Sequence, residues 1–267
     1  MSTLLSHFER VTCVSQSQML IFSQSLGPMK KVNQRNYLSS NISAFVFAHD
    51  HYGHGRSGGI RVKPPSFQTY VDDVVNHIKD LKIIYKEVPV FLFGFSLGGL
   101  IAYHVARLYP ELVNGIILEA PALQTIVNIN YWKGLFNFMT KMAPNIALPS
   151  LQIPSQLTTD PEEQKELNKD TLSYHGGVKL HHGNVITKAI DDAQKSFAKF
   201  NQSLLIIFGE KDRVVSIKGA KKLMEKSPSK DKTLIVYPGL KHILHRENRS
   251  KRLKIFEDVT NWIVDRI

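Results

Sequence analysis

The chain has 267 residues, of which 43% are hydrophobic, and this is enough apolar side chain to build a sizeable core rather than a disordered chain. Lysine and arginine outnumber aspartate and glutamate by 34 to 23, and the net charge of +11 favours approach to anionic surfaces such as phospholipid headgroups. Because the basic residues are scattered and no aromatic residues are interleaved with them, we expect no nucleic-acid partner.

Cysteine usage and hydropathy bear on the compartment. The single cysteine, Cys13, cannot form an internal disulfide, which is typical of a reducing compartment. The N-terminus lacks the pattern of a signal peptide because Glu9 and Arg10 interrupt its apolar residues, and no run of 18 apolar residues indicates a transmembrane helix. We therefore expect a cytoplasmic protein that can touch membranes peripherally. The sequence leaves the oligomeric state open.

From Ser43 onward, short apolar runs rich in β-forming residues alternate with amphipathic stretches. This alternation is typical of a mostly parallel sheet flanked by helices, so the predicted fold class is α/β. Strands are predicted at 44–48, 89–95, 115–118, 204–208 and 233–237. Helices are predicted after an N-cap at Ser66, directly after Ser96 and ending before Pro110, at 220–226, and from near Ser250.

Two segments fall outside this alternation. Segment 121–200 mixes helical stretches with Pro, Asn and charged residues and is too long for a simple crossover, so we interpret it as an inserted helical cap. Its apolar cluster could line an acyl tunnel, face a membrane or pack inward as the core of the cap. The members of this cluster are Trp132, Leu135, Phe136, Phe138, Met139 and Met142. Residues 1–36 show weak periodicity, and no structure is predicted there.

The motif with the clearest chemistry is Gly94-Phe95-Ser96-Leu97-Gly98, which matches G-x-S-x-G. The pattern alone is weak, but here it lies between a predicted strand and a predicted helix, where small residues allow a tight turn that exposes a nucleophilic serine. The start of the helix directs backbone N–H groups toward a developing oxyanion, so the amide of Leu97 is the predicted donor. The alternative is an ordinary glycine-rich turn.

A serine hydroxyl needs a base to take its proton and a third group to orient that base. Asp212 follows the predicted strand 204–208, and His242 follows the predicted strand 233–237. Ser96, Asp212 and His242 thus occur in the chain order that α/β hydrolases use. We predict that they form the catalytic triad.

Each of these assignments has rivals. Glu210 lies two residues before Asp212, and Asp191 lies near the end of the cap segment. Asp212 could instead cap the helix that follows it. His245 comes three residues after His242 and could share a helical turn with it. We favour Asp212 and His242 because of their positions after the strands.

Several other histidines could suggest metal ligation. They are His49, His51, His54, His181 and His182. No cysteine lies near them, His-Glu-x-x-His is absent and carboxylates at ligand spacing are missing, so neither a metal nor another cofactor is predicted. We instead expect the glycine-rich stretch 53–59 to form a loop beside the active site, with Asp50 and Ser57 making local backbone hydrogen bonds.

Taken together, several stretches of the chain resemble the monoglyceride lipase family, a branch of the α/β hydrolases that includes sequences labelled lysophospholipase and serine aminopeptidase. The matching stretches are 45–57, 90–99, 209–212, 216–220 and 231–247. The resemblance implies an α/β-hydrolase fold in a single domain, 37–267, with the cap at about 121–200. Residues 1–36 do not resemble the family.

The resemblance implies the same serine, aspartate and histidine as the triad and the same amide, that of Leu97, as an oxyanion donor. It also implies that His245 lies near the alcohol end of the substrate pocket. Members of the family carry a His-Gly-x-Gly loop that supplies a second oxyanion donor, and no such motif precedes Phe45 here.

The implied activity is hydrolysis of a carboxylic ester through an acyl-enzyme, with a lipid ester, monoacylglycerol, as the substrate. Loss of one oxyanion donor costs roughly 10²-fold to 10³-fold in turnover, so a weak or inactive relative is one alternative. A lysophospholipase, a thioesterase or a peptidase would use the same triad. An epoxide hydrolase or dehalogenase is disfavoured because those related folds have an aspartate where Ser96 stands.

Overall fold

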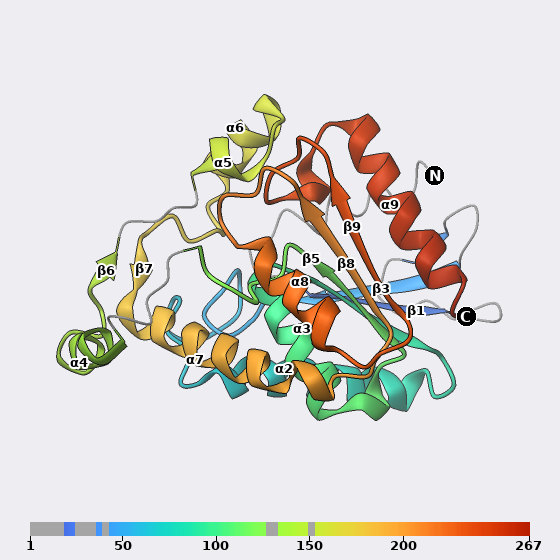
Figure 1. Cartoon of the computed structure of the whole chain (residues 1–267), viewed down its shortest axis with the longest axis horizontal. Helices are drawn as coiled ribbons and strands as arrows, with labels where there is room; N and C mark the ends of the chain where they lie inside the picture. The colour runs from blue at the N-terminus through green and yellow to red at the C-terminus, as the bar shows by residue number, and fades with distance from the viewer. Residues whose placement is uncertain (1–18, 25–35, 39–42, 127–132, 149–152) are drawn as a thin grey trace.

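The computed structural model describes residues 19–24, 36–38, 43–126, 133–148 and 153–267 (Figure 1). Within these ranges the central feature is a seven-stranded sheet with the order β2-β3-β1-β4-β5-β8-β9. Its strands are β1 (Met19–Gln24), β2 (Asn36–Leu38), β3 (Ser43–His49), β4 (Val90–Phe95), β5 (Gly115–Glu119), β8 (Leu204–Gly209) and β9 (Lys232–Tyr237). Each of the five predicted strands is present, with ends within one residue of the prediction.

Most of the sheet is parallel. β4 pairs with β5, β5 with β8 and β8 with β9 in parallel, whereas β1 is antiparallel to both of its neighbours, β3 and β4. The carboxyl ends of β4, β5, β8 and β9 therefore lie at one edge of the sheet, where parallel α/β sheets place their functional side chains.

Strand β1 lies in the segment for which no structure was predicted. Its first residue, Met19, pairs with His49 on one side and with Gly94 on the other. An apolar run of four residues, 19–22, is too short to be identified by periodicity, and its place in the sheet depends on two strands that are distant in sequence. The structure thus extends the sheet into the region before residue 37.

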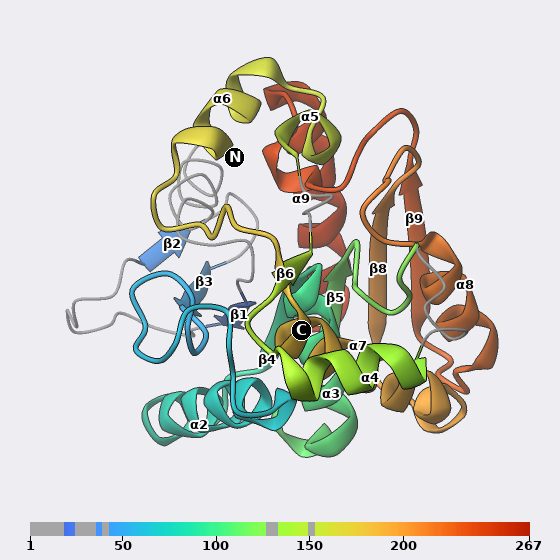
Figure 2. The same cartoon turned by 90° about the vertical axis from the view of Figure 1, so that its left-hand side faces the viewer.

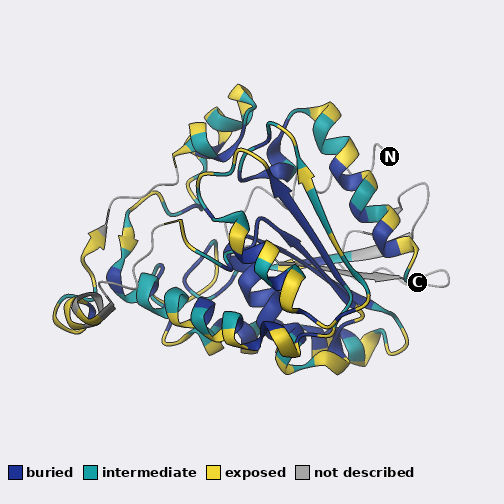
Figure 3. Ribbon diagram, viewed as in Figure 1, coloured by how far each residue is buried: buried dark blue, intermediate teal, exposed yellow. Residues whose placement is uncertain are grey.

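Helices cover both faces of the sheet. α2 (Phe67–Ile84) and α3 (Leu97–Leu108) lie on one face and α9 (Arg249–Val264) lies on the other (Figures 1 and 2). Every residue of β4, β5 and β8 is buried, as expected for parallel strands covered on both sides (Figure 3). On the α9 face, Trp262 packs edge-on against Phe91 with ring centroids 6.0 Å apart.

The helix ends follow the predicted signals. Ser66 is the N-cap of α2, and its side chain accepts a hydrogen bond from the amide of Thr69 at 3.4 Å. α3 ends one residue before Tyr109, which precedes Pro110. α8 (Ile217–Lys226) begins after Ser216, whose side chain accepts from the amide of Lys218.

The segment between β5 and β8 has two parts. α4 (Lys133–Met142) and the short antiparallel pair β6 (Ala147–Leu148) and β7 (Val178–Lys179) project from the body of the molecule, as Figure 1 shows. α5 (Pro154–Leu157) and α6 (Pro161–Lys169) lie beside the start of α9 (Figure 2), and α7 (Leu180–Ser196) returns to pack on α3 through a hydrogen bond of 2.9 Å between the Tyr103 and Ser196 hydroxyls.

The described side chains of the predicted apolar cluster are exposed. Phe138, Met139 and Met142 of α4 are 61%, 38% and 72% exposed. Trp132 lies outside the described residues, and the side chains of Leu135 and Phe136 are not described. An inward-packed core made of the three described side chains is therefore excluded. Among the described residues, no helix combines the length and apolar character needed to cross a bilayer.

Candidate active site

The candidate nucleophile, Ser96, lies in the turn between β4 and α3. Its backbone has φ 52° and ψ −113°, a positive φ that residues with a side chain seldom adopt. Its amide donates to the carbonyl of Glu119 at 2.9 Å, and its carbonyl accepts from the amide of Ala122 at 3.0 Å. These two bonds to the end of β5 hold the strained turn in place.

Glycines are required where the start of α3 packs against the end of β4. A Cβ atom at Gly94 would lie 2.3 Å from the carbonyl oxygen of Gly98, and one at Gly99 would lie 2.8 Å from Cβ of Pro121. Any larger residue at these positions would push the helix away from the strand. The motif therefore has the strand-turn-helix context predicted for it. Leu97 is the first residue of α3, and helices leave their first amides without an internal acceptor, which suits the predicted oxyanion role.

The structure brings the three predicted triad residues together. Nε2 of His242 lies 3.0 Å from Oγ of Ser96, and Nδ1 of His242 lies 2.7 Å from Oδ2 of Asp212. The side chains of His242 and Asp212 are each 1% exposed. The imidazole thus bridges a hydroxyl and a carboxylate in a site from which water is largely excluded, the geometry that general-base activation of a serine requires.

Asp212 has a second set of partners that fixes its orientation. Its Oδ1 atom accepts from the amides of Val214 and Val215 at 2.7 and 3.1 Å. Since Ser216 caps α8, the possibility that Asp212 serves only as that cap is wrong. The rival Glu210 instead accepts from the amide of Gly239, in the loop that leads to His242.

The edge of the sheet beside Ser96 also receives the start of β1. Met19 pairs with Gly94, two residues before Ser96, so the chain enters β1 next to the nucleophile. Residues 1–18 lie outside the described residues.

A buried glutamate beside the triad was missed by the sequence analysis. Glu119 is the last residue of β5 and is 0% exposed. Its Oε1 atom accepts from the amide of Leu244 at 2.7 Å, and Nδ1 of His245 lies 2.8 and 2.9 Å from its two carboxylate oxygens. The signal in the sequence was a charged residue at the end of an apolar run, but nothing in the sequence indicated which loop it would meet.

Comparison with known proteins agrees with this geometry. The model of the family described as serine aminopeptidase, S33, matches residues 40–249. The chain belongs to this family. It is 34% identical to monoglyceride lipase from Rattus norvegicus over 230 residues, which are 85% of this chain and 75% of that protein.

Solved structures share the fold of this S33 family member. Monoacylglycerol lipase from Paleococcus ferrophilus superposes with a TM-score of 0.73 at 24% identity, covering 84% of each chain. A soluble variant of monoglyceride lipase from Saccharomyces cerevisiae, in complex with a substrate analog, has a TM-score of 0.69 at 22% identity, covering 84% of this chain and 78% of that one. The predicted α/β-hydrolase fold is confirmed, and the relatives confirm the predicted class of serine esterase or lipase.

A group of five histidines lies around the end of β3, at the same edge of the sheet as the Ser96 turn, and we name it the histidine cluster. Its members are His49, His51, His54, His77 and His182. His49 and His77 are joined through their Nδ1 atoms at 3.0 Å, whereas neither ring nitrogen of the fully buried His51 has a hydrogen-bond partner among the described residues. Within the described part of the chain, no group of three or more His, Cys, Asp or Glu residues is arranged to hold a metal ion.

The loop that carries part of this cluster was predicted from its glycines. As expected, Asp50 accepts a hydrogen bond from the amide of Arg56 at 2.9 Å, and the Ser57 hydroxyl donates to the carbonyl of Asp50. Gly53, Gly55 and Gly59 have positive φ angles of 69°, 49° and 98°. The turn chemistry was thus set by local sequence.

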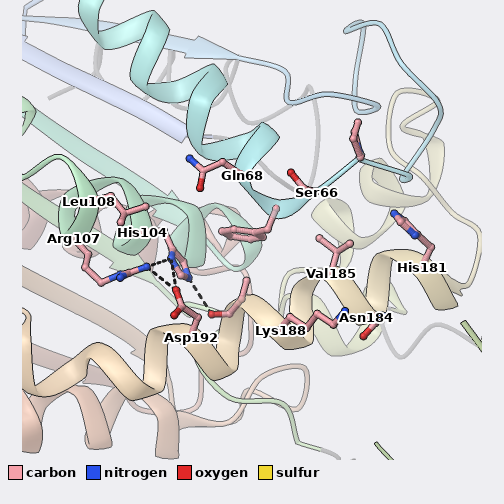
Figure 4. Close-up of a pocket in the computed structure, with 13 residues that line it drawn as sticks. Ser66, Gln68, His104, Arg107, Leu108, His181, Asn184, Val185, Lys188 and Asp192 are labelled. Atoms are coloured by element: carbon pink, nitrogen blue, oxygen red, sulfur yellow. Dashed lines mark hydrogen bonds and ion pairs between the residues drawn. The ribbon is translucent and has the colours of Figure 1, made fainter. Parts of the chain in front are cut away.

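A separate cavity of about 430 Å³ lies between the start of α2, α3 and α7 (Figure 4). None of the triad residues lines it. On its wall, Asp192 accepts from Arg107 at 2.6 Å, and the buried imidazole of His104 bonds to the carbonyl of Ala189 at 3.0 Å. Burial is the main cause that lowers the pKa of His104 to about 4, so this ring stays neutral near pH 7. His104, Arg107 and Asp192 on this wall are paired with one another, which is a structural arrangement.

Proposed function

We propose that this protein hydrolyses the ester bond of monoacylglycerols through an acyl-enzyme on Ser96. The observation that carries the proposal is the continuous hydrogen-bonded chain from Oγ of Ser96 through His242 to Asp212, with distances of 3.0 and 2.7 Å. Ser96 attacks the ester carbonyl carbon while Nε2 of His242 takes its proton, and the amide of Leu97 donates to the oxyanion.

The second half of the reaction returns the enzyme to its starting state. His242 gives the proton to the leaving glycerol oxygen as the bond between carbonyl carbon and oxygen breaks. Water then attacks the acyl-serine, His242 takes one of its protons, and the fatty acid leaves as Ser96 recovers its hydroxyl proton. Asp212 holds the Nδ1–H tautomer throughout and stabilises the imidazolium that forms in each half.

The choice of a lipid substrate rests on two observations. The monoglyceride lipase from Rattus norvegicus matches most of the chain, and the described apolar side chains of α4 face outward rather than into a core. We propose that His245, which follows the triad histidine by three residues, contacts the alcohol part of the substrate. The exposed side chains of α4 would then meet the lipid phase in which the acyl chain resides.

We also propose that the protein is cytoplasmic and contacts membranes peripherally. Exposed Phe138 and Met142 supply apolar contact, and the net charge of +11 favours anionic headgroups. Binding to vesicles that contain phosphatidylserine should weaken as salt is raised from 50 to 500 mM, because the charges are screened. Binding that ignores salt would contradict the electrostatic part of the proposal.

The decisive test combines covalent labelling with turnover. A fluorophosphonate probe should label the wild-type protein and leave Ser96→Ala unlabelled. Monoacylglycerol should be hydrolysed faster than lysophospholipid, an acyl thioester or an aminoacyl amide. Faster turnover of one of these three would instead identify a lysophospholipase, a thioesterase or a peptidase.

The second candidate, a relative with little or no activity, is favoured by the absence of His-Gly-x-Gly before Phe45. An unlabelled wild-type Ser96 in folded protein would support it. Labelling without turnover of any of the four substrates would leave a reactive serine whose substrate is none of these.

A further inference from the structure

We propose that Glu119 is a positioning residue of the active site, whose carboxylate holds the loop that carries His242 in register with the Ser96 turn. The inference rests on the proposed hydrolysis, because the position of His242 matters only if Ser96 is the nucleophile. It concerns a carboxylate that is distinct from the triad aspartate and comes from a different strand.

Glu119 contacts both halves of the Ser96–His242 pair through different atoms. Its backbone carbonyl accepts the amide of Ser96 at 2.9 Å, so the nucleophile turn is fixed to the end of β5. Its side-chain Oε1 accepts the amides of Leu244 and His245 at 2.7 and 3.3 Å. Glu119, at the end of β5, thus links the turn that holds Ser96 to the loop residues that follow His242.

The loop needs such an anchor because it leaves the edge strand of the sheet. β9 is only partly buried, and the chain from Pro238 to Ile243 has no regular secondary structure before a short 3₁₀ turn at Leu244–Arg246. Catalytic groups must be held to within about 0.5 Å of their working positions, and loops alone do this less well than strands. The contact with β5 gives the loop the rigidity of the centre of the sheet.

Burial makes the contact specific. The Glu119 side chain is fully enclosed, and a buried carboxylate is tolerated only where donors surround it. Here three N–H groups of the same loop supply those donors: the amides of Leu244 and His245 and Nδ1 of His245. Any displacement of the loop would leave the carboxylate without partners, so the native position is strongly favoured over shifted ones.

The aromatic ring beneath the site shows that the two histidines are held as one unit. The Phe95 ring lies 4.8 Å from the His242 ring and 5.2 Å from the His245 ring. With Glu119 bonded to Nδ1 of His245, the imidazole next to His242 cannot rotate freely against this ring. The carboxylate therefore fixes a side chain that packs on the same ring as His242, as well as the backbone amides two and three residues after His242.

The test compares Glu119→Ala and Glu119→Gln with a matched pair at Glu210. Glu210 also accepts a hydrogen bond from an amide of this loop, that of Gly239, but Glu210 is exposed and Gly239 precedes His242 in the chain. In Glu119→Ala, both kcat and the rate of fluorophosphonate labelling of Ser96 should fall roughly 10-fold to 100-fold, while KM changes less than about threefold, because the reacting atoms are misplaced by a fraction of an ångström.

Glu119→Gln should recover most of the loss, since its amide oxygen can still accept at the Oε1 position. Glu210→Ala and Glu210→Gln should label at the wild-type rate. Thermal unfolding and circular dichroism of each variant restrict the comparison to folded protein. A folded Glu119→Ala that labels at the wild-type rate would overturn the proposal, as would a Gln variant as slow as the Ala variant.

A readout independent of catalysis separates this inference from the proposed function. Amide hydrogen exchange at Leu244 and His245 should accelerate at least tenfold in Glu119→Ala, while amides within β5 and β8 keep their protection. If wild-type Ser96 does not label, the proposed function fails and the exchange experiment still tests the positioning role. Unchanged exchange in the loop would refute that role even in an active enzyme.

Discussion

Two groups of histidines among the described residues differ in their hydrogen-bond partners. His242 and His245 each have a carboxylate at Nδ1, from Asp212 at 2.7 Å and from Glu119 at 2.8 Å. In the histidine cluster, His49 has another histidine at that position, and His51 has no partner at either ring nitrogen within the part of the chain that the structure describes. Burial is similar in the two groups, so the acceptor is what distinguishes them.

The presence or absence of a carboxylate partner decides whether a buried histidine can act in proton transfer or serves as a packing group. A carboxylate beside an imidazole stabilises the imidazolium, so such a ring can take and return a proton during a reaction. In the histidine cluster burial is the main influence, and it lowers the pKa of His49 to about 4 and that of His182 to about 3. These rings remain neutral near pH 7 and act as aromatic packing groups.

The largest effect that this comparison predicts comes from removing the carboxylate of the first group. Asp212→Asn should lower kcat about 10⁴-fold with little change in folding, because an amide NH₂ facing Nδ1 favours the tautomer in which Nε2 cannot accept the serine proton. Steady-state turnover and labelling of Ser96 measure the loss. Asp192→Asn is the control, since Asp192 lies 3.7 Å from Nδ1 of the buried His104 but outside the triad, and its turnover should match the wild type. A loss of less than tenfold in Asp212→Asn would remove Asp212 from the mechanism.

The triad could be predicted from the sequence because each member has a local signature. Ser96 is framed by glycines that the turn requires, and Asp212 and His242 lie in the loops that follow the apolar strands β8 and β9. Parallel strands bring their carboxyl ends to one edge without further information. Three short local patterns were therefore enough to place three distant side chains together.

Glu119 and β1 could not be predicted in the same way. The role of Glu119 depends on which loop crosses the end of β5, and its partners, Leu244 and His245, are more than 120 residues away. β1 becomes a strand because β3 and β4 both pair with it, although its own sequence is short and flanked by polar residues. Tertiary contacts decide such cases, and single-sequence periodicity does not contain them.

A second, smaller effect should follow from the histidine cluster, in which burial is the main cause that lowers the pKa of each ring. Their folded-state pKa values lie below 6.5, so the unfolded chain binds more protons than the folded one between pH 6.5 and about 4. The stability that these rings contribute is thus fully present above pH 6.5 and is lost as the pH falls toward 4. On the order of 2 kcal/mol per histidine is expected over this interval.

Urea denaturation at pH 7.5, 6.0 and 4.5 would measure this change in the free energy of unfolding. Replacing the exposed His175 by Gln provides the matched control at a surface histidine. A free energy of unfolding that stays constant from pH 7.5 to 4.5 would mean that the cluster is protonated without cost, contrary to its burial.

The smallest predicted effect concerns one ring of the histidine cluster, that of His51. His51 is fully buried, its pKa is lowered well below the usual value mainly by that burial, and its ring contacts the His49 and Tyr70 rings at 4.9 and 5.5 Å. Since no described hydrogen bond is lost, His51→Phe should change the free energy of unfolding at pH 7.5 by less than about 1 kcal/mol while preserving the ring contacts. At pH 4.5 the variant should be more stable than the wild type, because it lacks one group that only the unfolded chain protonates. A variant that loses stability at pH 7.5 and keeps the acid sensitivity of the wild type would show that His51 has a polar partner and belongs with the carboxylate-bound histidines.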